Sequence, residues 1–452
     1  MIYKREEGEV QPGWHWGRFT VRIPGIHVRL NWPMTIQGGL IHVGFAASAV
    51  ALKMEYFDMP FEVAWSMSVI YMFWMFIGTL FLGEPYSPGW ITPALPLTLM
   101  YLQGFTPGTE AVKAMTALAL TVGLVFLLLG VTGLGRKIYE LVPSELRAGI
   151  IMGAAIAAFL GEFERLEEMP VTLFAVYGFT ILFLYSVWFT NLQLKNKLLE
   201  RLAHMTILVG FAIGAIVGIS SGEVSITIET WGSYTPQFGE YLSSVLPYYI
   251  GWPSLDMYLS ALPIAFIAYV VAFGDMIVAN TLIEDADNAR KDEDIQIDTT
   301  RTHYSLAIRN IFQILTGGPF IPMHGPIFAG GTVFLIKVYS ESRKTLDSLY
   351  EGTCNFNWFG LLMAFLGPAV FFFGPLADVG LGITLIITGV ACAQLAMRIV
   401  TTIVGYGYIL LVGLIFGHYG PQWGLLFGVL LYFWLVYERE PKDPKKGPTE
   451  ES

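Results

Sequence analysis

Asp275 is a carboxylate in the middle of a long apolar stretch, Ala272-Phe273-Gly274-Asp275-Met276. In a hydrocarbon environment such a group is costly unless it is protonated, paired with a basic residue or bound to a cation. One interpretation is a structural pair with Asn280 or Arg309. We predict instead that Asp275, together with Asn280, forms an ion-coupling site for H⁺ or Na⁺, or that Asp275 contacts a solute directly.

Other polar groups lie where the surrounding sequence is apolar or irregular. His324 belongs to a proline-rich interruption, where its ring either faces a cavity or serves as a structural hydrogen-bonding group. Gln37 and His42 fall in the first apolar segment, and we expect His42 to pack rather than to bind. Arg309 is the one basic residue well inside a predicted span, so it is either a counter-charge for an anion or a partner of lipid phosphate.

Two short motifs of the same pattern interrupt the hydrophobic chain. Pro85-Tyr86-Ser87-Pro88 and Pro319-Phe320-Ile321-Pro322 share Pro-aromatic-x-Pro and are 234 residues apart in a chain of 452. Proline lacks an N–H and fixes φ, so 84–90 and 318–324 are predicted to be extended rather than helical. Such backbone is tolerated at membrane depth only where it is buried in protein or lines a polar cavity. The alternative is that the prolines only kink ordinary helices.

Each extended piece is predicted to lead into a half-helix, one starting near Thr92 and one near Pro326. In opposite orientations, the two N-termini would face one another near the middle of the membrane with free N–H groups and partial positive charge. Such a site suits an anion, or a heterocycle with acceptor oxygens. The predicted substrate-binding residues are Tyr86, Gly89, Trp90, Ile91, Thr92, Gln37, Met323, His324, Gly325 and Pro326.

The composition that surrounds these residues is that of a membrane protein. Hydrophobic residues make up 54% of the chain and charged residues 14%, and the mean hydropathy is +0.57. Segments with few charges recur at about the ~20 residues that a helix needs to cross the hydrocarbon. We therefore predict an all-α polytopic fold with about fourteen transmembrane segments, at 33–54, 61–83, 84–103, 111–132, 144–161, 171–190, 203–220, 258–282, 302–317, 318–338, 356–373, 375–394, 397–417 and 420–437.

The distribution of Lys and Arg sets the expected orientation. Basic residues gather in every second loop, and the loops between them are acidic or neutral, so both termini are predicted to be cytoplasmic, in a bacterial inner membrane. Alternating apolar residues on either side of Pro24-Gly25 predict a small hairpin or an extended interfacial segment in the cytoplasmic segment 1–32. The acidic run 284–294 is predicted to be a solvated loop, and the tail 438–452 to be disordered.

An internal repeat is indicated by a second pair of matches. Pro33 and Pro263 each open an apolar segment, and Gly44 and Gly274 each follow eleven residues later, at an offset of 230. With the proline motifs, this predicts two inverted seven-span repeats, at 33–220 and 258–437, joined by an extracytoplasmic loop at 221–257.

The interruptions Gly83-Glu84-Pro85-Tyr86-Ser87-Pro88-Gly89-Trp90 and 317–325 resemble the third and tenth spans of xanthine/uracil permeases (nucleobase–cation symporters) and of the related sulfate permeases and bicarbonate exchangers. The resemblance implies short strands before the half-helices and a core of spans one to four and eight to eleven. It also implies a gate of spans five to seven and twelve to fourteen, elevator-type alternating access and a homodimer through the gate. Gln37 precedes Gly38 rather than a histidine, and Pro326-Ile327-Phe328 replaces a polar motif. The chain therefore resembles a divergent member, for which a nucleobase solute is not implied.

Three classes of function fit a chain of this kind to different degrees. A secondary active transporter of a small anionic or heterocyclic solute, coupled to H⁺ or Na⁺, explains the interrupted spans and Asp275. A passive anion channel or an uncoupled exchanger is the alternative. A scaffold or an enzyme is disfavoured, because neither needs paired unwound segments. The sequence predicts no cofactor, no metal site, no nucleic-acid partner and, with only Cys354 and Cys392, no disulfide framework.

Overall fold

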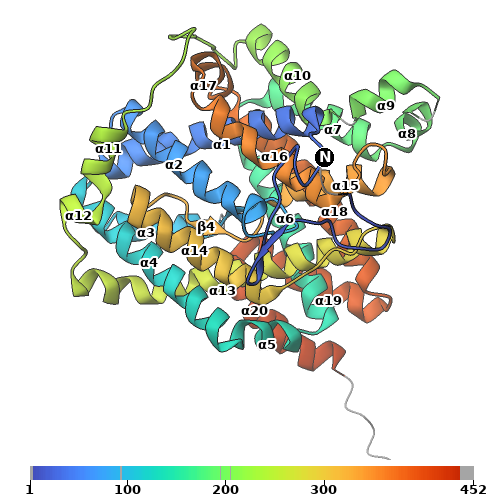
Figure 1. The fold of residues 1–452 in the computed structure, drawn as a ribbon. Helices are drawn as coiled ribbons and strands as arrows, with labels where there is room; N and C mark the ends of the chain where they lie inside the picture. Colours follow the sequence, from blue (N-terminus) through green and yellow to red (C-terminus); the bar gives the residue numbers. More distant parts are fainter. Residues whose placement is uncertain (1–3, 92–93, 194, 204, 438–452) are drawn as a thin grey trace, which may run out of the picture.

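The computed structural model describes residues 4–91, 94–193, 195–203 and 205–437. Helices dominate these residues, and the strands are two pairs of very short segments (Figure 1). The strands are β1 (Trp14–Trp16), β2 (Phe19–Val21), β3 (Gly89–Trp90) and β4 (His324–Gly325). The helices are α1 (Trp32–Phe57), α2 (Phe61–Leu80), α3 (Leu95–Leu102), α4 (Thr109–Thr132), α5 (Leu134–Leu141), α6 (Ser144–Leu166), α7 (Pro170–Tyr185), α8 (Val187–Gln193), α9 (Lys197–Ala203), α10 (Thr206–Ser221), α11 (Phe238–Val245), α12 (Pro247–Ile250), α13 (Leu255–Ala289), α14 (Thr299–Gly317), α15 (Ala329–Glu341), α16 (Leu349–Met363), α17 (Gly367–Phe373), α18 (Ala377–Ile399), α19 (Ile403–Tyr419), α20 (Pro421–Leu431) and the π-helical turn η2 (Tyr432–Val436).

The predicted spans correspond in order to helices of the structure. Six described helices, α1, α2, α4, α6, α13 and α18, are individually long and apolar enough to cross a membrane. Helices α7 and α8 reach that length and hydropathy only together, with a bend of 63° between them. The remaining predicted spans match the shorter helices α3, α10, α14, α15, α16, α19 and α20 with η2. The protein is therefore an all-α polytopic membrane protein.

Side-chain caps define several of the helix starts. Asn31 accepts from Met34 N at the start of α1, and Ser254 accepts from Met257 N at the start of α13. Asp298 accepts from two backbone amides of α14. These caps satisfy amides that would otherwise be unpaired in the first turn. They fix where the chain re-enters the bundle.

The packing pattern shows the two-fold repeat directly. Helix α1 packs against α16, and its counterpart α13 packs against α4; α2 packs against α16, and α14 against α4. In the same way, the contact of α1 with α18 corresponds to that of α13 with α6. The contact of α19 with α6 corresponds to that of α7 with α18. Each contact recurs with the roles of the two halves exchanged, as a pair of inverted repeats requires.

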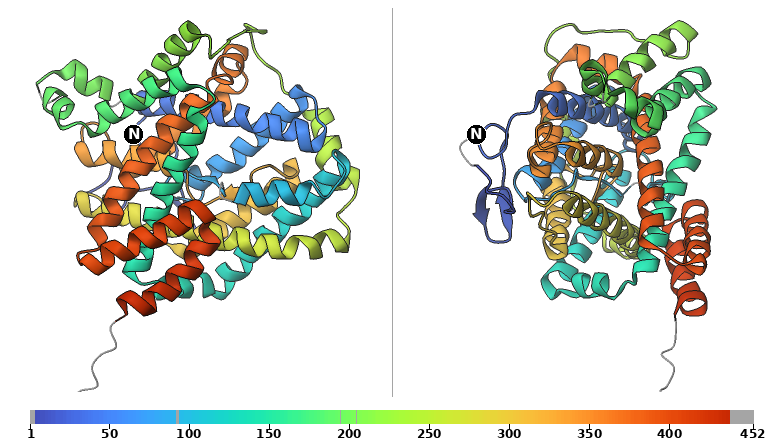
Figure 2. Two further views of the ribbon diagram at one scale, coloured as in Figure 1. Left: turned by 180° about the vertical axis from the view of Figure 1, so that it is seen from behind. Right: turned by 90° about the vertical axis from the view of Figure 1, so that its right-hand side faces the viewer.

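The helices divide into two groups that pack mainly within themselves. We call α1–α4 and α13–α16 the core, and α6, α7, α10, α18, α19 and α20 the gate. The right-hand view of Figure 2 shows the N-terminal segment on one side of the molecule and α19 and α20, in red, on the other. The principal contacts between the groups join α15 and α1 to α18, and α13 to α6 and α20. We call the face where α1, α6 and α16 begin and α13, α15 and α18 end the terminal face.

The N-terminal segment lies against the core and differs from the predicted hairpin. Its antiparallel pair joins β1 to β2 around Gly17, whose φ is +62°, and Pro24 forms only an isolated bridge with Val28. Gly17 supplies the left-handed conformation that this tight turn demands. A turn also forms at Pro24-Gly25, where Gly25 has a φ of +83° and donates to Val28 O (2.8 Å), but the residues on either side of it do not form a strand ladder. The buried Arg5 pairs with Asp292, and the segment is thereby anchored to the α13–α14 connection.

Helix α13 corrects the expectation of a solvated acidic loop. Pro263 lies inside this helix, and the segment 221–257 contains α11, α12 and the first residues of α13. The acidic residues up to Asp287 belong to the last turns of α13 and not to a solvated loop. The 35 residues of α13 exceed the ~20 that a helix needs to cross the hydrocarbon, so the helix is long enough for its acidic end to lie outside the apolar layer. The predicted disordered tail lies outside the described residues.

Candidate solute-binding site

The two proline interruptions meet as an antiparallel strand pair. In β3 and β4, Gly89 is paired with Gly325, and Trp90 with His324. The pair is extended by hydrogen bonds on both sides, from Ile91 N to Met323 O (3.0 Å) and from Phe328 N to Ser87 O (2.7 Å). Two broken spans from opposite halves of the sequence therefore share one hydrogen-bonded segment inside the core, which satisfies backbone that could not otherwise be buried.

Glycine is required where the strands cross. A Cβ added at Gly89 would lie 2.3 Å from the carbonyl oxygen of Ile327, and one at Gly325 would lie 2.4 Å from the backbone of Trp90. Both neighbours are backbone atoms, so no side-chain rotation relieves the overlap. The close approach is therefore encoded by these two residues.

Each strand leads into a short helix that runs away from the junction. Helix α3 begins at Leu95 and α15 at Ala329, each three residues later than predicted, and neither start has a side-chain cap. The loop around Gly108, which follows α3, is bonded to Tyr56 at the end of α1. Helix α3 therefore ends on the face opposite the terminal face, whereas α15 ends on the terminal face. The two uncapped N-termini thus converge from opposite directions and leave amides and partial positive charge at the junction.

Aromatic rings form the wall beside the strands. Tyr71 of α2 stacks on Phe320 (ring centroids 3.6 Å apart) and on His324 (4.1 Å). Trp90 lies 5.8 Å from Phe45 of α1, and Phe45 lies 4.9 Å from Phe328 at the start of α15. Such faces can hold a planar solute or shield an anion from water.

His324 is held by its backbone and not by its ring. Asn310 of α14 accepts from His324 N (3.2 Å) and donates to His324 O (3.0 Å). The ring is 1% exposed, and both ring nitrogens lack a hydrogen-bond partner among the described residues. A buried polar ring without a partner costs free energy, so these nitrogens are available for a solute.

Arg309 has a partner that the sequence did not reveal. Its guanidinium lies 3.7 Å from the carboxylate of Glu84 and donates to Gly325 O (2.9 Å), and both side chains are fully buried. The pair joins α14 to the interruption of the third span. Arg309 therefore positions β4 and is already neutralised, and is not the free counter-charge that one interpretation predicted.

Lys53 of α1 is a second basic group that the sequence assignment missed. It is fully buried, donates to Ala64 O (3.3 Å) and to Ser68 Oγ, and lies 4.2 Å above the ring of Phe320. Within the described part of the chain, no carboxylate lies within ion-pair distance of its ammonium group. The column Lys53–Phe320–Tyr71–His324 thus links a buried amine to the strand pair.

Asp275 lies in the central part of α13 and is partly exposed. The predicted structural pair is not observed, because Asn280 donates to Thr299 Oγ1 (3.4 Å) and Arg309 pairs with Glu84. The neighbouring Gly274 faces Phe416 and Ile150 of the gate. Gly274 therefore lies at the core–gate boundary, and the role of Asp275 as a coupling residue stays a prediction.

The other predicted site residues have varied surroundings. Tyr86 is buried and shares a 2.7 Å hydrogen bond with Thr302, so its hydroxyl is used structurally. Gln37 accepts from Ile207 N of α10 (3.1 Å) and connects core to gate. His42 packs between aromatic rings and bonds to Gly38 O (2.6 Å), as expected. Ile91, Met323 and Pro326 are buried at the junction, and Thr92 lies outside the described residues.

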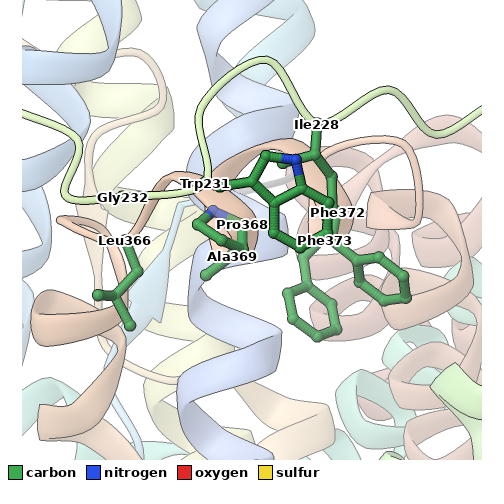
Figure 3. Close-up of a pocket in the computed structure, with 8 residues that line it drawn as sticks. All are labelled: Ile228, Trp231, Gly232, Leu366, Pro368, Ala369, Phe372 and Phe373. Carbon is green, nitrogen blue, oxygen red and sulfur yellow. The ribbon is translucent and has the colours of Figure 1, made fainter.

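A well-defined pocket lies elsewhere. It has a volume of about 570 Å³ and lies between α17 and the loop after α10, where Trp231, Phe372 and Phe373 are prominent (Figure 3). Its lining is almost entirely apolar. It offers no group to fix a charged solute, and we do not assign the transport site to it.

Comparisons with known proteins found structural similarity but no related sequence. No family model matches the sequence, and no curated protein compared with it is similar. Similar solved structures include that of SLC26A9, at 14% identity over 89% of this chain and 64% of the other, with a TM-score of 0.42. They also include the transmembrane domain of the cyanobacterial bicarbonate transporter BicA, at 16% identity over 87% of this chain and 97% of the other, with a TM-score of 0.48. This chain spans less than two thirds of the first. At these scores neither similarity assigns a solute, and the conclusions below rest on the geometry.

Proposed function

We propose that this protein is a secondary active transporter that carries a small solute across the membrane, with the junction of β3, β4, α3 and α15 as its binding site. The supporting observation is that two uncapped half-helices of opposite direction converge on a strand pair contributed by both repeats. Unwound backbone at the middle of a transporter fold marks the place where solute binds.

The electrostatics favour an anion over a neutral heterocycle. Two helix N-termini contribute partial positive charge, Lys53 adds an amine without a carboxylate partner among the described residues, and Arg309 is neutralised by Glu84. A heterocycle with acceptor oxygens is the second candidate, because Trp90, Phe45 and Phe328 provide aromatic faces beside the same amides.

Coupling to H⁺ or Na⁺ is proposed to involve Asp275, with Asn280 as a neighbouring contributor. Moving one negative charge inward against the membrane potential costs about 2.3 kcal/mol per 100 mV. A cation co-transported at a carboxylate would remove that cost. The alternative is a passive anion channel or an uncoupled exchanger, which needs no carboxylate at this position.

We propose elevator-type alternating access, in which the core moves against the gate. The proposal is supported by the division of contacts between the two groups. We also propose that the protein forms a homodimer through the gate. Its location is proposed to be a bacterial inner membrane, with both termini in the cytoplasm. The glycine-rich segments of the gate are occupied within one chain, since Gly149 and Gly153 pack on Val412 and Phe416, and Gly413 packs on Met152. We therefore propose that dimer contacts use exposed apolar residues of the gate, such as those on the outward face of α19 and α20, and not these glycines.

A two-stage experiment tests this function. The purified protein is first screened for thermal stabilisation by nucleobases, carboxylates, sulfate and bicarbonate, with and without Na⁺. Solutes that stabilise it are then tested in proteoliposomes for uptake and counterflow. A transporter gives counterflow that is stimulated by solute on the opposite side and accumulation that depends on a H⁺ or Na⁺ gradient. Conductive flux without counterflow would identify the channel alternative, and no flux of any stabilising solute would exclude both.

A further inference from the structure

Ionic contacts between core and gate occur on one face of the molecule. Arg147, near the start of α6, lies 3.8 Å from Glu284 in α13, and Arg398, near the end of α18, lies 3.6 Å from Asp285. In both pairs the gate supplies the arginine and the core supplies the carboxylate. Both pairs lie on the terminal face, and among the described residues no ion pair joins core to gate on the opposite face.

A third contact on the same face reaches the site-bearing half-helix. Lys337, near the end of α15, donates to Leu184 O at the end of α7, and its ammonium lies 4.6 Å above the ring of Tyr185. Tyr185 in turn donates to Ile387 O of α18 (3.0 Å). The last carbonyl groups of a helix have no intrahelical partner, and Leu184 O is one of these in α7. Lys337 of the core donates to it and so links the core to the gate.

Helix α15 also packs closely against the gate near its start, at Gly330. A Cβ added at Gly330 would lie 2.5 Å from Thr384 Cβ and 2.6 Å from Thr384 O of α18. Helix α15 is thus held along its length, by close packing next to the site and by Lys337 at the terminal face. Any opening of the site toward the terminal face must separate these contacts.

We propose that the pairs Arg147–Glu284 and Arg398–Asp285, together with the contact of the core residue Lys337 with Leu184 O of the gate, form an electrostatic latch that holds core and gate together on the terminal face. The pairs are partly exposed, at 28% and 45% for Arg147 and Glu284 and at 66% and 41% for Arg398 and Asp285. Exposed pairs are individually weak and are screened by salt. A weak latch is what a transport cycle needs, because a strong one would trap the closed state.

The latch rests on the proposed core–gate movement, but its test needs no solute. Spin labels are placed at the exposed positions Ser144 of the gate and Asn288 of the core, in a background in which the buried Cys354 and Cys392 are replaced by Ala. The distance distribution between the labels then reports how far the terminal face is open. Its outcome is therefore independent of whether the transported solute has been identified.

Charge reversal provides the decisive comparison. The double variant Arg147→Glu, Arg398→Glu is expected to raise the ratio of the long-distance to the short-distance population about tenfold, and the quadruple variant that adds Glu284→Arg and Asp285→Arg is expected to restore the short distance. Arg136→Glu is the matched control, because the ion pair of Arg136 within the described residues is with Glu140 of the same helix α5, at 2.7 Å, and not with the gate. Raised salt should shift the unmodified protein toward the long distance and leave the double variant nearly unchanged.

Two outcomes would overturn the latch. One is that the folded double variant has the same distance distribution as the unmodified protein. The other is a shift that the quadruple variant fails to reverse, since that would show a loss of packing and not a loss of charge pairing. If the double variant does not fold, the disulfide variant Arg147→Cys, Glu284→Cys decides, because the latch requires it to cross-link readily and to hold the short distance.

Discussion

Trp90 and His324 are 234 residues apart in sequence and are register partners in a two-residue antiparallel ladder. The same offset separates the two Pro-aromatic-x-Pro motifs. The repeat in the sequence is thus converted into a physical contact, in which equivalent positions of the two halves meet at one place. The predictions below concern this junction and the charges around it.

The crossing of the strands depends on the absence of two side chains. Gly89→Ala and Gly325→Ala each place a Cβ within 2.5 Å of backbone atoms, so each is expected to destabilise the protein by about 2 kcal/mol or more. Thermal unfolding in mild detergent measures the effect. Gly178→Ala in α7 is the control, because nothing lies within 4 Å of its added Cβ. Equal stability of all three variants would mean that the strands are not closely crossed.

The buried Glu84–Arg309 pair is expected to be strongly coupled. Glu84→Gln leaves a buried guanidinium without its counter-charge and should destabilise the protein by about 3–5 kcal/mol. Replacing both partners, with Glu84→Gln and Arg309→Met, should recover most of that loss, and a double-mutant cycle on thermal unfolding measures the coupling. A double variant as unstable as the sum of the single ones would show that the two residues act separately.

Asp275→Asn is expected to leave the protein folded while it abolishes concentrative uptake. The reason is that the amide cannot bind a proton or compensate a cation, whereas solute exchange by counterflow needs neither. Uptake into proteoliposomes with and without an ion gradient separates the two activities. Asp256→Asn, at an exposed position in the first turn of the same helix, is the control. Undiminished ion-dependent accumulation by the Asp275 variant would place coupling elsewhere.

Lys53→Met should distinguish an anionic solute from a neutral one. Loss of a buried positive charge near the site is expected to weaken the binding of an anion about tenfold, or about 1.4 kcal/mol, because buried charges are poorly screened. The affinity for a neutral heterocycle should change little. Competition binding with both solute classes gives the comparison, and an equal effect on both would indicate that Lys53 acts only through packing.

Much of the fold could be read from the sequence because proline and composition act locally. Proline motifs predicted the interruptions at β3 and β4, since two prolines three residues apart each lack an N–H, fix φ and disfavour helix at the residue before them. Apolar segments of spanning length predicted the helices. The offset of the motifs predicted that two interruptions would correspond, and their pairing in one ladder agrees with it.

The polar contacts of the site could not be read in the same way, because they depend on which helices become neighbours. Glu84 and Arg309 come from opposite halves of the chain, and no local pattern indicates their pairing. Lys53 falls near the end of the first predicted span, where a lysine normally reaches the membrane surface. Its burial follows only from the packing of α1 beside Ser68 and Phe320. The acidic end of α13 was misassigned because charge was taken to mark the end of a helix.

The central claim is that solute binds at the junction of the two broken spans, and the binding affinity of a Trp90→Ala variant tests it most directly. The solute that stabilises the unmodified protein is measured by equilibrium binding against Trp90→Ala and against Trp252→Ala, an exposed tryptophan in the loop before α13. We predict at least a tenfold loss of affinity for Trp90→Ala, with folding retained, and no change for Trp252→Ala. Unchanged affinity in the Trp90 variant would contradict the assignment of the site.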